Sequence, residues 1–319
     1  MYNLGIDLGG TNIAVGVVNE KYEIIGRGKK KTNAPRPVEE IADDIAAACR
    51  MAIEDAGLTL ADISSAGIGA PGSIDPVNGV IATSNNLRFS NAPMVALVSE
   101  RLEGIKCYIE NDANAAAYGE YMAGAGKGTN DFITITLGTG VGCGIIIGGK
   151  LFTGSNYAGG ELGHTVMIYG GEQCTCGRKG CWETYASATA LIRQTKAAME
   201  KNPDSVMWQL TDGSIDRVSG RTAFDAMRKG DVAGKAVVDQ YALYVTCGIT
   251  NVVNTFQPDV LCIGGGISHE GETLIAPIRE DNQKQRYSKN VAKQTEIRAA
   301  LLGNDAGIIG AACLYNLNN

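Results

Sequence analysis

The 319-residue sequence lacks any hydrophobic run that approaches the roughly 20 residues of a membrane-spanning helix. Its first residues, MYNLGIDLGG, lack the basic region, apolar segment and cleavage site of a secretory signal. It also lacks an excess of positive charge: the net charge is −6, and the one basic run, Lys29–Lys31, is too short for the many phosphate contacts of nucleic-acid binding. We therefore expect a cytoplasmic protein with no membrane or nucleic-acid partner, and a solvated strand end or turn at these lysines.

Histidine is scarce, with two residues, whereas there are nine cysteines. A disulfide framework is not expected, because the cytosol keeps thiols reduced and a chain of this length can build its own core. The second histidine, His269, has no matching cluster of cysteines and is expected in a loop or on the surface. Six scattered cysteines in apolar surroundings are predicted to be small buried hydrophobes: Cys49, Cys107, Cys143, Cys247, Cys262 and Cys313.

The other histidine, His164, is followed by three closely spaced cysteines, Cys174, Cys176 and Cys181. One imidazole and three thiolates can complete a tetrahedral zinc shell that leaves no open position for water. Because a closed shell stabilises a loop, the spacing predicts structural Zn²⁺ in a loop over about 164–181. A redox pair or three free cysteines are the alternatives.

A partial internal repeat indicates the organisation of the chain. NLGIDLGGTNIAVGVVN at Asn3–Asn19 and ITITLGTGVGCGIIIGG at Ile133–Gly149 each read as a β-rich run, a Gly/Thr turn and a second β-rich run. Two such hairpins about 130 residues apart, in a chain longer than one ordinary domain, favour two lobes of related architecture.

Strands and helices alternate elsewhere. Pro37–Gly57 has helical periodicity, a second long helix is expected from Asp231 toward Val253, and Lys201–Gly220 should be irregular or short-helical. Alternation of this kind predicts an α/β protein with mostly parallel sheets, whose ligands gather where strand ends meet helix starts.

The two hairpin turns carry residues suited to phosphate. Glycines let backbone N–H groups approach phosphate oxygens, threonine adds a hydroxyl donor, and Asp7 could hold Mg²⁺ directly or through water. Either turn alone could be a plain turn; together they favour a nucleotide clamp. The run Gly264–Gly266 could approach an adenine or ribose face, although an isolated triple glycine is more often a loop.

In the segment CYIENDANAAAYGEYMAGA, Asn111 and Asp112 follow a short apolar strand and precede an alanine-rich stretch that is expected to be helical. Asp112 is therefore expected at a strand end, where a carboxylate could act as the base that a phosphotransferase needs. The alternative is that Asp112 only caps the helix, and both roles could coexist.

Motifs over nearly the whole chain resemble the ROK family of bacterial sugar kinases and repressors. The matching segments are D-x-G-G-T at Asp7–Thr11, END at Glu110–Asp112, LGTGVG at Leu137–Gly142, GGELGH at Gly159–His164, CTCGRKGCWETYAS at Cys174–Ser187 and GGGIS at Gly264–Ser268. The resemblance implies a two-lobed actin-like ATPase fold, ribonuclease H-like, with the active site in the interlobe cleft. It places residues 1–117 plus 304–319 in an N-terminal lobe and 118–303 in a C-terminal lobe.

The resemblance also implies roles for residues. Asp112 is expected to be the general base, and His164 to bind both zinc and sugar. ATP and Mg²⁺ are expected at Asp7, Gly9, Gly10, Thr11, Asn12, Gly138, Thr139, Gly140, Gly264, Gly265 and Gly266. The sugar is expected at Gly72, Asn86, Asn111, Asp112, Glu161, His164 and Glu183, with Gly72 and Asn86 the weaker matches. Phe89 stands where many relatives have tryptophan, so the resemblance does not define the edge of the sugar pocket.

The function implied is ATP-dependent phosphorylation of a hexose, with glucose preferred because the cysteine loop resembles that of the glucokinase members. N-acetylmannosamine, N-acetylglucosamine, fructose or allose remain open as substrates. A repressor is disfavoured, because the first phosphate turn starts at Asp7 and leaves no room before it for a helix-turn-helix. An inactive sugar-binding module is disfavoured, because Asp112 and both turns are present. A homodimer or homotetramer is expected from the family.

Overall fold

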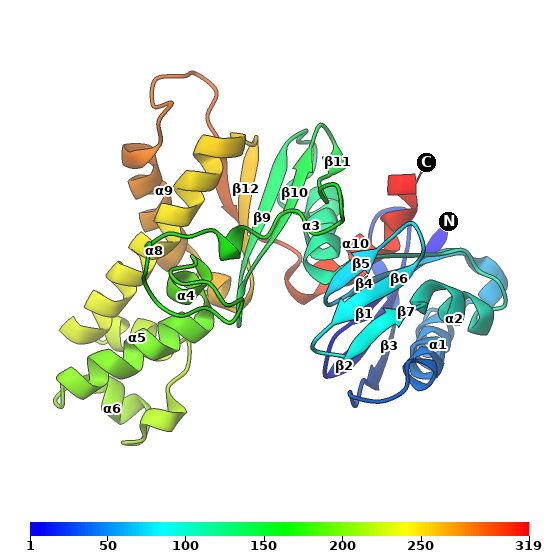
Figure 1. Ribbon diagram of the computed structural model, residues 1–319, viewed down its shortest axis with the longest axis horizontal. Helices are drawn as coiled ribbons and strands as arrows, with labels where there is room; N and C mark the ends of the chain where they lie inside the picture. Colours follow the sequence, from blue (N-terminus) through cyan, green and yellow to red (C-terminus); the bar gives the residue numbers. More distant parts are fainter. Residues whose placement is uncertain (319) are drawn as a thin grey trace. The chain divides into compact units, whose positions relative to one another are not determined.

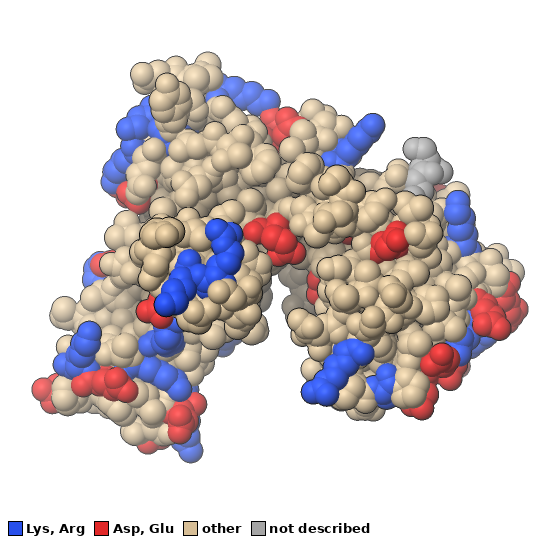
Figure 2. Space-filling model, in the orientation of Figure 1, with Lys and Arg blue, Asp and Glu red and all other residues tan. Residues whose placement is uncertain are grey.

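The computed structural model describes residues 1–318, which form two compact units (Figure 1). The first unit combines Met1–Ile133, Gly144–Gly160 and the C-terminal segment that begins at Ala300. The second combines Thr134–Cys143 and Glu161–Ala299. Basic and acidic side chains are interspersed on the face drawn in Figure 2. Among the described residues, no helix is both long and apolar enough to cross a membrane.

A five-stranded sheet of order β3-β2-β1-β4-β8 forms the centre of the first unit. The predicted hairpin is present, with Asp7 opposite Ala14 across antiparallel β1 and β2. Strands β1, β4 and β8 run parallel, so their carboxyl ends meet at one edge of the sheet. The strands are β1 (Tyr2–Leu8), β2 (Asn12–Val18), β3 (Ile24–Lys31), β4 (Ile63–Ala70) and β8 (Cys107–Asn111).

Helices pack on this sheet at very short range. The predicted helix α1 (Val38–Asp55) lies on β3, where a Cβ atom on Gly28 would be 1.9 Å from the carbonyl oxygen of Ala48. On the other face, a Cβ atom on Gly5 would be 1.8 Å from the carbonyl oxygen of Ile308 in α10 (Ala306–Ala312). Glycine is therefore required at these two sites, because any side chain would push the helix off the sheet. The unit's other helices are α2 (Met94–Arg101), α3 (Asp112–Ala123), η1 (Leu60–Asp62), η5 (Gly303–Asp305) and η6 (Leu314–Asn318).

A small antiparallel sheet between β4 and α2 has no counterpart in the sequence predictions. Its strands are β5 (Ser73–Asp75), β6 (Val80–Ser84) and β7 (Phe89–Ala92). It carries the two weaker sugar-site candidates on its connections, Gly72 before β5 and Asn86 between β6 and β7.

A second five-stranded sheet has the order β11-β10-β9-β12-β13. Its β9 and β10 form the second predicted hairpin, with the residues LGTGV at the turn. Strands β12 and β13 are parallel. The strands are β9 (Phe132–Leu137), β10 (Val141–Ile147), β11 (Lys150–Leu151), β12 (Val260–Gly264) and β13 (Glu296–Ala299).

Helices make up most of the second unit. The long helix predicted from Asp231 is α8, and the Asp231 side chain caps it by accepting a 2.6 Å hydrogen bond from the N–H of Gly234. Residues 201–220 hold only short helices, as expected. The helices are η2 (Leu162–His164), α4 (Glu183–Ala186), α5 (Ala188–Lys201), α6 (Val206–Leu210), η3 (Ile215–Arg217), α7 (Thr222–Arg228), α8 (Val232–Phe256), η4 (Gly266–Glu270) and α9 (Glu272–Gln285).

The smaller predictions have mixed outcomes. Five of the six scattered cysteines are buried, but the prediction for Cys247 is wrong: it is only partly buried, because it lies on α8 between the helix's buried and exposed faces. Lys29–Lys31 end β3 with Lys29 and Lys31 exposed, and His269 is exposed in η4, both as expected.

Candidate functional site

The first glycine turn links β1 and β2, and a threonine distant in sequence holds it. The N–H of Gly9 donates to the carbonyl of Asn12 at 2.9 Å. The buried Thr32 makes two further bonds, donating from its N–H to the carbonyl of Thr11 (3.0 Å) and from its hydroxyl to the carbonyl of Gly9 (2.6 Å). These bonds fix the loop that sequence reasoning assigned to phosphate. No local motif marks Thr32, because its partners lie in the turn, more than 20 residues earlier in the sequence.

Asp7 is the penultimate residue of β1, beside this turn, and lines a cavity of about 760 Å³. Burial, and secondly the negative charge of Asp112, raises the pKa of Asp7 to about 6. Asn12 Oδ1 is also buried and has no hydrogen-bond partner in the described part of the chain. The lining residues are Asp7, Gly9, Gly10, Thr11, Asn12, Ala14, Val15, Arg27, Gly28, Lys29, Met51, Asn304, Asp305 and Ile308.

Asp112 is the first residue of α3, directly after β8. The cap of α3 is the preceding Asn111, whose Oδ1 accepts from the N–H groups of Ala113 (2.9 Å) and Asn114 (3.2 Å). Asp112 Oδ1 accepts only from the N–H of Ala113 among these donors, at 2.9 Å. Burial raises the pKa of Asp112, against the opposing effect of that N–H. Asn111, rather than Asp112, is therefore the main cap of α3, and capping does not stand against a chemical role for Asp112.

The other sugar-site candidates of the first unit lie close by. The side-chain amide of Asn111 donates to the carbonyl of Gly72 at 3.1 Å. Gly72 has φ +116°, and a Cβ atom there would lie 2.1 Å from the carbonyl oxygen of Thr83, so no other residue fits. The exposed Asn86 lies against Gly10, with its Cβ 3.6 Å from where a Cβ on Gly10 would be.

Glu110 in β8 and Gly307 in α10 lie close to these residues but were missed from the sequence. Glu110 is 5% exposed, and its carboxylate accepts from the N–H of Asn111 (2.8 Å) and the amide of Asn114 (3.0 Å), while burial raises its pKa. A Cβ atom on Gly307 would lie 3.6 Å from the carboxyl carbon of Asp7. The END motif could have suggested Glu110, whereas Gly307 lies 300 residues from Asp7 and has no sequence signal.

The second glycine turn lies in the second unit. The N–H of Gly138 donates to the carbonyl of Gly140 at 3.0 Å. Glu183 Oε2 accepts from the N–H of Val141 at 2.9 Å, so the structure brings this sugar-site candidate to the turn. Gly265 packs under the turn, because a Cβ atom there would lie 2.5 Å from the carbonyl oxygen of Leu137. Gly264 ends β12 and Gly266 opens η4 on either side of it.

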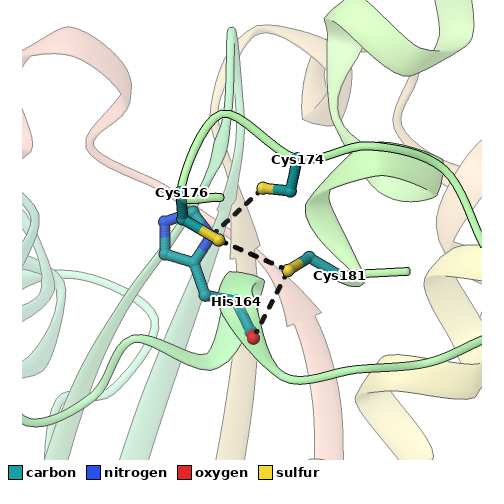
Figure 3. Close-up of side chains that lie close together, drawn as sticks. All are labelled: His164, Cys174, Cys176 and Cys181. Carbon is teal, nitrogen blue, oxygen red and sulfur yellow. Dashed lines mark hydrogen bonds between the residues drawn. The ribbon is translucent and has the colours of Figure 1, made fainter. Parts of the chain in front are cut away.

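The four predicted metal ligands converge (Figure 3). Their candidate donor atoms all lie within 4.8 Å of one another, and Cys174 Sγ is 3.6 Å from His164 Nδ1. Cys176 Sγ is 3.6 Å from Cys181 Sγ. Burial raises the pKa of Cys181 to about 12, whereas the backbone N–H of Arg178 lowers the pKa of Cys176. This cluster can hold a metal ion.

Glu161 precedes η2, the short helix that carries His164, and is exposed. Its charge adds to burial in raising the pKa of Cys143. The predicted residues thus form two groups, one in each unit. The first holds Asp7, Gly9, Gly10, Thr11, Asn12, Gly72, Asn86, Asn111 and Asp112, and the second Gly138, Thr139, Gly140, Glu161, His164, Cys174, Cys176, Cys181, Glu183, Gly264, Gly265 and Gly266.

A glycine-turn hairpin within each of two sheets defines an α/β protein of the actin-like ATPase class. The sequence model of the ROK family matches residues 3–317, and the chain belongs to this family. It is 38% identical to a glucokinase of Streptomyces coelicolor over 98% of this chain and 96% of that protein, and 36% identical to a Thermotoga maritima glucokinase with the same coverage. A crystal structure of a ROK family glucokinase from Streptomyces griseus, in complex with glucose and AMPPNP, matches with a TM-score of 0.83 and 38% identity over 98% of this chain and 99% of that one.

Proposed function

We propose that this protein is an ATP-dependent hexose kinase that converts glucose to glucose 6-phosphate. Near end-to-end similarity to glucokinases, at 36–38% identity, supports the proposal most directly. The similarity includes an enzyme whose crystal structure holds glucose and AMPPNP, a sugar and an ATP analogue. The residues that such chemistry needs are present in both units.

Asp112 is the proposed general base. Its carboxylate takes the proton from the sugar 6-hydroxyl as that oxygen attacks the γ-phosphorus, the bond to the β-phosphate oxygen breaks, and ADP leaves. A raised pKa makes the carboxylate a better proton acceptor than an exposed aspartate, and capping of α3 by Asn111 leaves it available. Most of the rate enhancement then comes from positioning and charge stabilisation.

Asp7 and Asn12 fit a magnesium ion beside the first turn. Both offer oxygen ligands, which Mg²⁺ prefers, and the raised pKa of Asp7 and the orphaned Asn12 Oδ1 indicate a place that lacks positive charge. When bound, Mg²⁺ offsets the charge on the phosphates of ATP. The backbone of Gly9–Thr11 and of Gly138–Gly140, with the Gly264–Gly266 run, is the proposed remainder of the nucleotide site.

The cysteine loop fits structural zinc. Zinc bonds of about 2.3 Å to sulfur and 2.0–2.1 Å to nitrogen give tetrahedral edges of about 3.6–3.8 Å. Two edges of the cluster, 3.6 Å each, agree with these values, and all four candidate donor atoms lie within 4.8 Å of one another. With Nδ1 of His164 toward the metal, its other ring nitrogen would serve the sugar, together with Asn111, Glu161 and Glu183.

The remaining expectations stay proposals. They are the lobes 1–117 plus 304–319 and 118–303, a cytoplasmic location, a homodimer or homotetramer, and no nucleic-acid or membrane partner.

A coupled ADP-release assay with Mg²⁺-ATP tests the function. It compares kcat/KM for glucose, mannose, fructose, allose, N-acetylglucosamine and N-acetylmannosamine. We expect the highest value for glucose. Preference for an acetylated sugar would support the kinase function but change the assigned substrate. No turnover with any sugar would favour a sugar-binding module without activity.

Asp112→Asn tests the base in the same assay. Asparagine keeps the size and hydrogen bonding of the side chain but cannot accept the proton, so kcat should fall by at least about 100-fold with little change in glucose affinity. Near-normal turnover in this variant would remove Asp112 from the role. Asp62→Asn, in the exposed η1 segment, is the matched control and should retain activity.

A further inference from the structure

A short segment that follows the cysteine loop holds the second glycine turn by three hydrogen bonds. Glu183 Oε2 accepts from the N–H of Val141 (2.9 Å), and the N–H of Ala188 donates to the carbonyl of Gly138 (2.7 Å). The hydroxyl of Thr189 donates to the carbonyl of Thr139 (2.8 Å). The turn is thus held at both ends and in the middle by Glu183–Thr189.

Two of these bonds engage carbonyl groups of the turn, and none of them uses its two central N–H groups. The carbonyls of Gly138, Thr139 and Gly140 are all engaged within the protein. Within residues 1–318, no hydrogen bond is made by the N–H groups of Thr139 and Gly140. Successive backbone N–H groups in a turn, with their carbonyls turned away, form an anion-binding concavity.

The segment itself is firmly anchored. Trp182, directly before Glu183, is 1% exposed, and its indole N–H donates to the carbonyl of Tyr244 in α8 at 2.9 Å. Gly248 lies under the indole, where a Cβ atom would come within 1.9 Å of the ring. Ser187 caps α5 by accepting from the N–H of Ala190 at 3.1 Å. A rigid base lets the segment fix the turn rather than move with it.

We propose that Thr189 is a positioning residue for the nucleotide. Its hydroxyl holds the Thr139 carbonyl away from the ligand, which keeps the N–H group of Gly140, in the same peptide unit, aimed at a phosphate group beside the N–H group of Thr139. Without this bond, the Thr139–Gly140 peptide can rotate and present its carbonyl to an anion. The proposal rests on the proposed kinase function, in which this turn binds ATP.

Thr189→Val removes the hydroxyl and keeps the shape of the side chain, whereas Thr189→Ser keeps the hydroxyl. Thr189 is exposed, so neither change disturbs the core. We expect the Kd for AMPPNP, measured by isothermal titration calorimetry, and the KM for ATP to rise about threefold to tenfold in Thr189→Val. The KM for glucose and the bound zinc should not change, and Thr189→Ser should behave as wild type.

Wild-type affinity for AMPPNP in Thr189→Val would overturn the proposal, and so would an equal rise in the KM for glucose. A loss in Thr189→Ser as large as in Thr189→Val would also overturn it, because the hydroxyl would not be the cause. The proposed function would fail in a different way, if the wild-type protein bound AMPPNP but phosphorylated no sugar. In that case the titration with AMPPNP would still test the role of Thr189.

Discussion

At the residue scale, Asp7 and Asp112 are two carboxyl groups placed where neither ionises easily. Asp7 lies near the carboxyl end of β1 and Asp112 directly follows β8, both at one edge of the first sheet, and each pKa is raised mainly by burial. The charge of Asp112 adds to the shift at Asp7. Such an arrangement costs folding free energy at neutral pH, which is typical of sites that serve function rather than stability.

Asp7→Asn should therefore stabilise the metal-free protein near pH 8. A carboxyl whose pKa is about 6 when folded and 3.8 when unfolded favours folding below pH 4, and this advantage is lost as the pH rises through 6. Asparagine never ionises, so the free energy of unfolding at pH 8 should rise by about 1–3 kcal/mol. At pH 4.5 the gain should largely disappear, and kinase activity should be strongly reduced at either pH.

Urea denaturation in EDTA at the two pH values measures this effect. Asp204→Asn, at an exposed position before α6, removes the same charge and should show no pH-dependent gain. Equal stability of Asp7→Asn and the wild type at pH 8 would mean that the Asp7 carboxylate is not disfavoured in the folded protein.

At the scale of elements, the cysteine loop is irregular backbone held by few regular hydrogen bonds. Two isolated bridges, Val166 with Cys181 and Gln173 with Lys179, connect its two sides, together with a 3.0 Å hydrogen bond from the Arg178 guanidinium to the carbonyl of His164. A metal ion would add a stronger cross-link, and metal binding free energy then becomes folding free energy for the loop.

Cys176→Ala should release zinc and weaken glucose binding. Three ligands hold the ion poorly, and a loosened His164 presents its second nitrogen less well to the sugar. The zinc content measured by metal analysis should fall from about one ion per chain to well below half an ion, and the KM for glucose should rise several-fold. Cys247→Ala, a cysteine on α8 outside the cluster, is the control; full zinc occupancy in Cys176→Ala would show that the ligand set is wrong.

Elements were predictable from the sequence where a local pattern decides them. Both hairpins, α1 and α8 follow from periodicity and from their glycine, proline and aspartate boundaries. The sheet β5-β6-β7 was not, because its strands of three to five residues carry too little alternation to detect. Thr32 and Thr189 were missed for another reason: each acts through hydrogen bonds to residues 21–50 positions away, which only the folded chain reveals.

At the scale of the whole molecule, the first unit is completed by the end of the chain. The segment from Ala300 returns to it, and α10 lies directly on β1 and β4, where Cβ atoms on Gly5 and Gly67 would each come within 1.8 Å of its carbonyl oxygens. The same segment lines the cavity beside Asp7. The first half of the site therefore depends on residues from both ends of the sequence.

Glu120 anchors the start of the C-terminal segment that returns to the first unit. It is 1% exposed near the end of α3, and its carboxylate accepts from the N–H groups of Leu302 (2.7 Å), Ala125 (2.9 Å) and Leu301 (3.0 Å). Glu120→Ala removes the acceptor of these three hydrogen bonds, and each lost bond costs about 1–3 kcal/mol where water does not replace the carboxylate. The free energy of unfolding should fall by at least about 3 kcal/mol.

Urea denaturation at pH 7 measures the loss, with Glu54→Ala on the exposed face of α1 as the matched control, which should change stability by no more than about 0.5 kcal/mol. Glu120→Gln should fall between the two, because one amide oxygen can still accept while the amide N–H group faces other donors. If Glu120→Ala were as stable as Glu54→Ala, water would be replacing the carboxylate, and α10 would hold the returning segment without it.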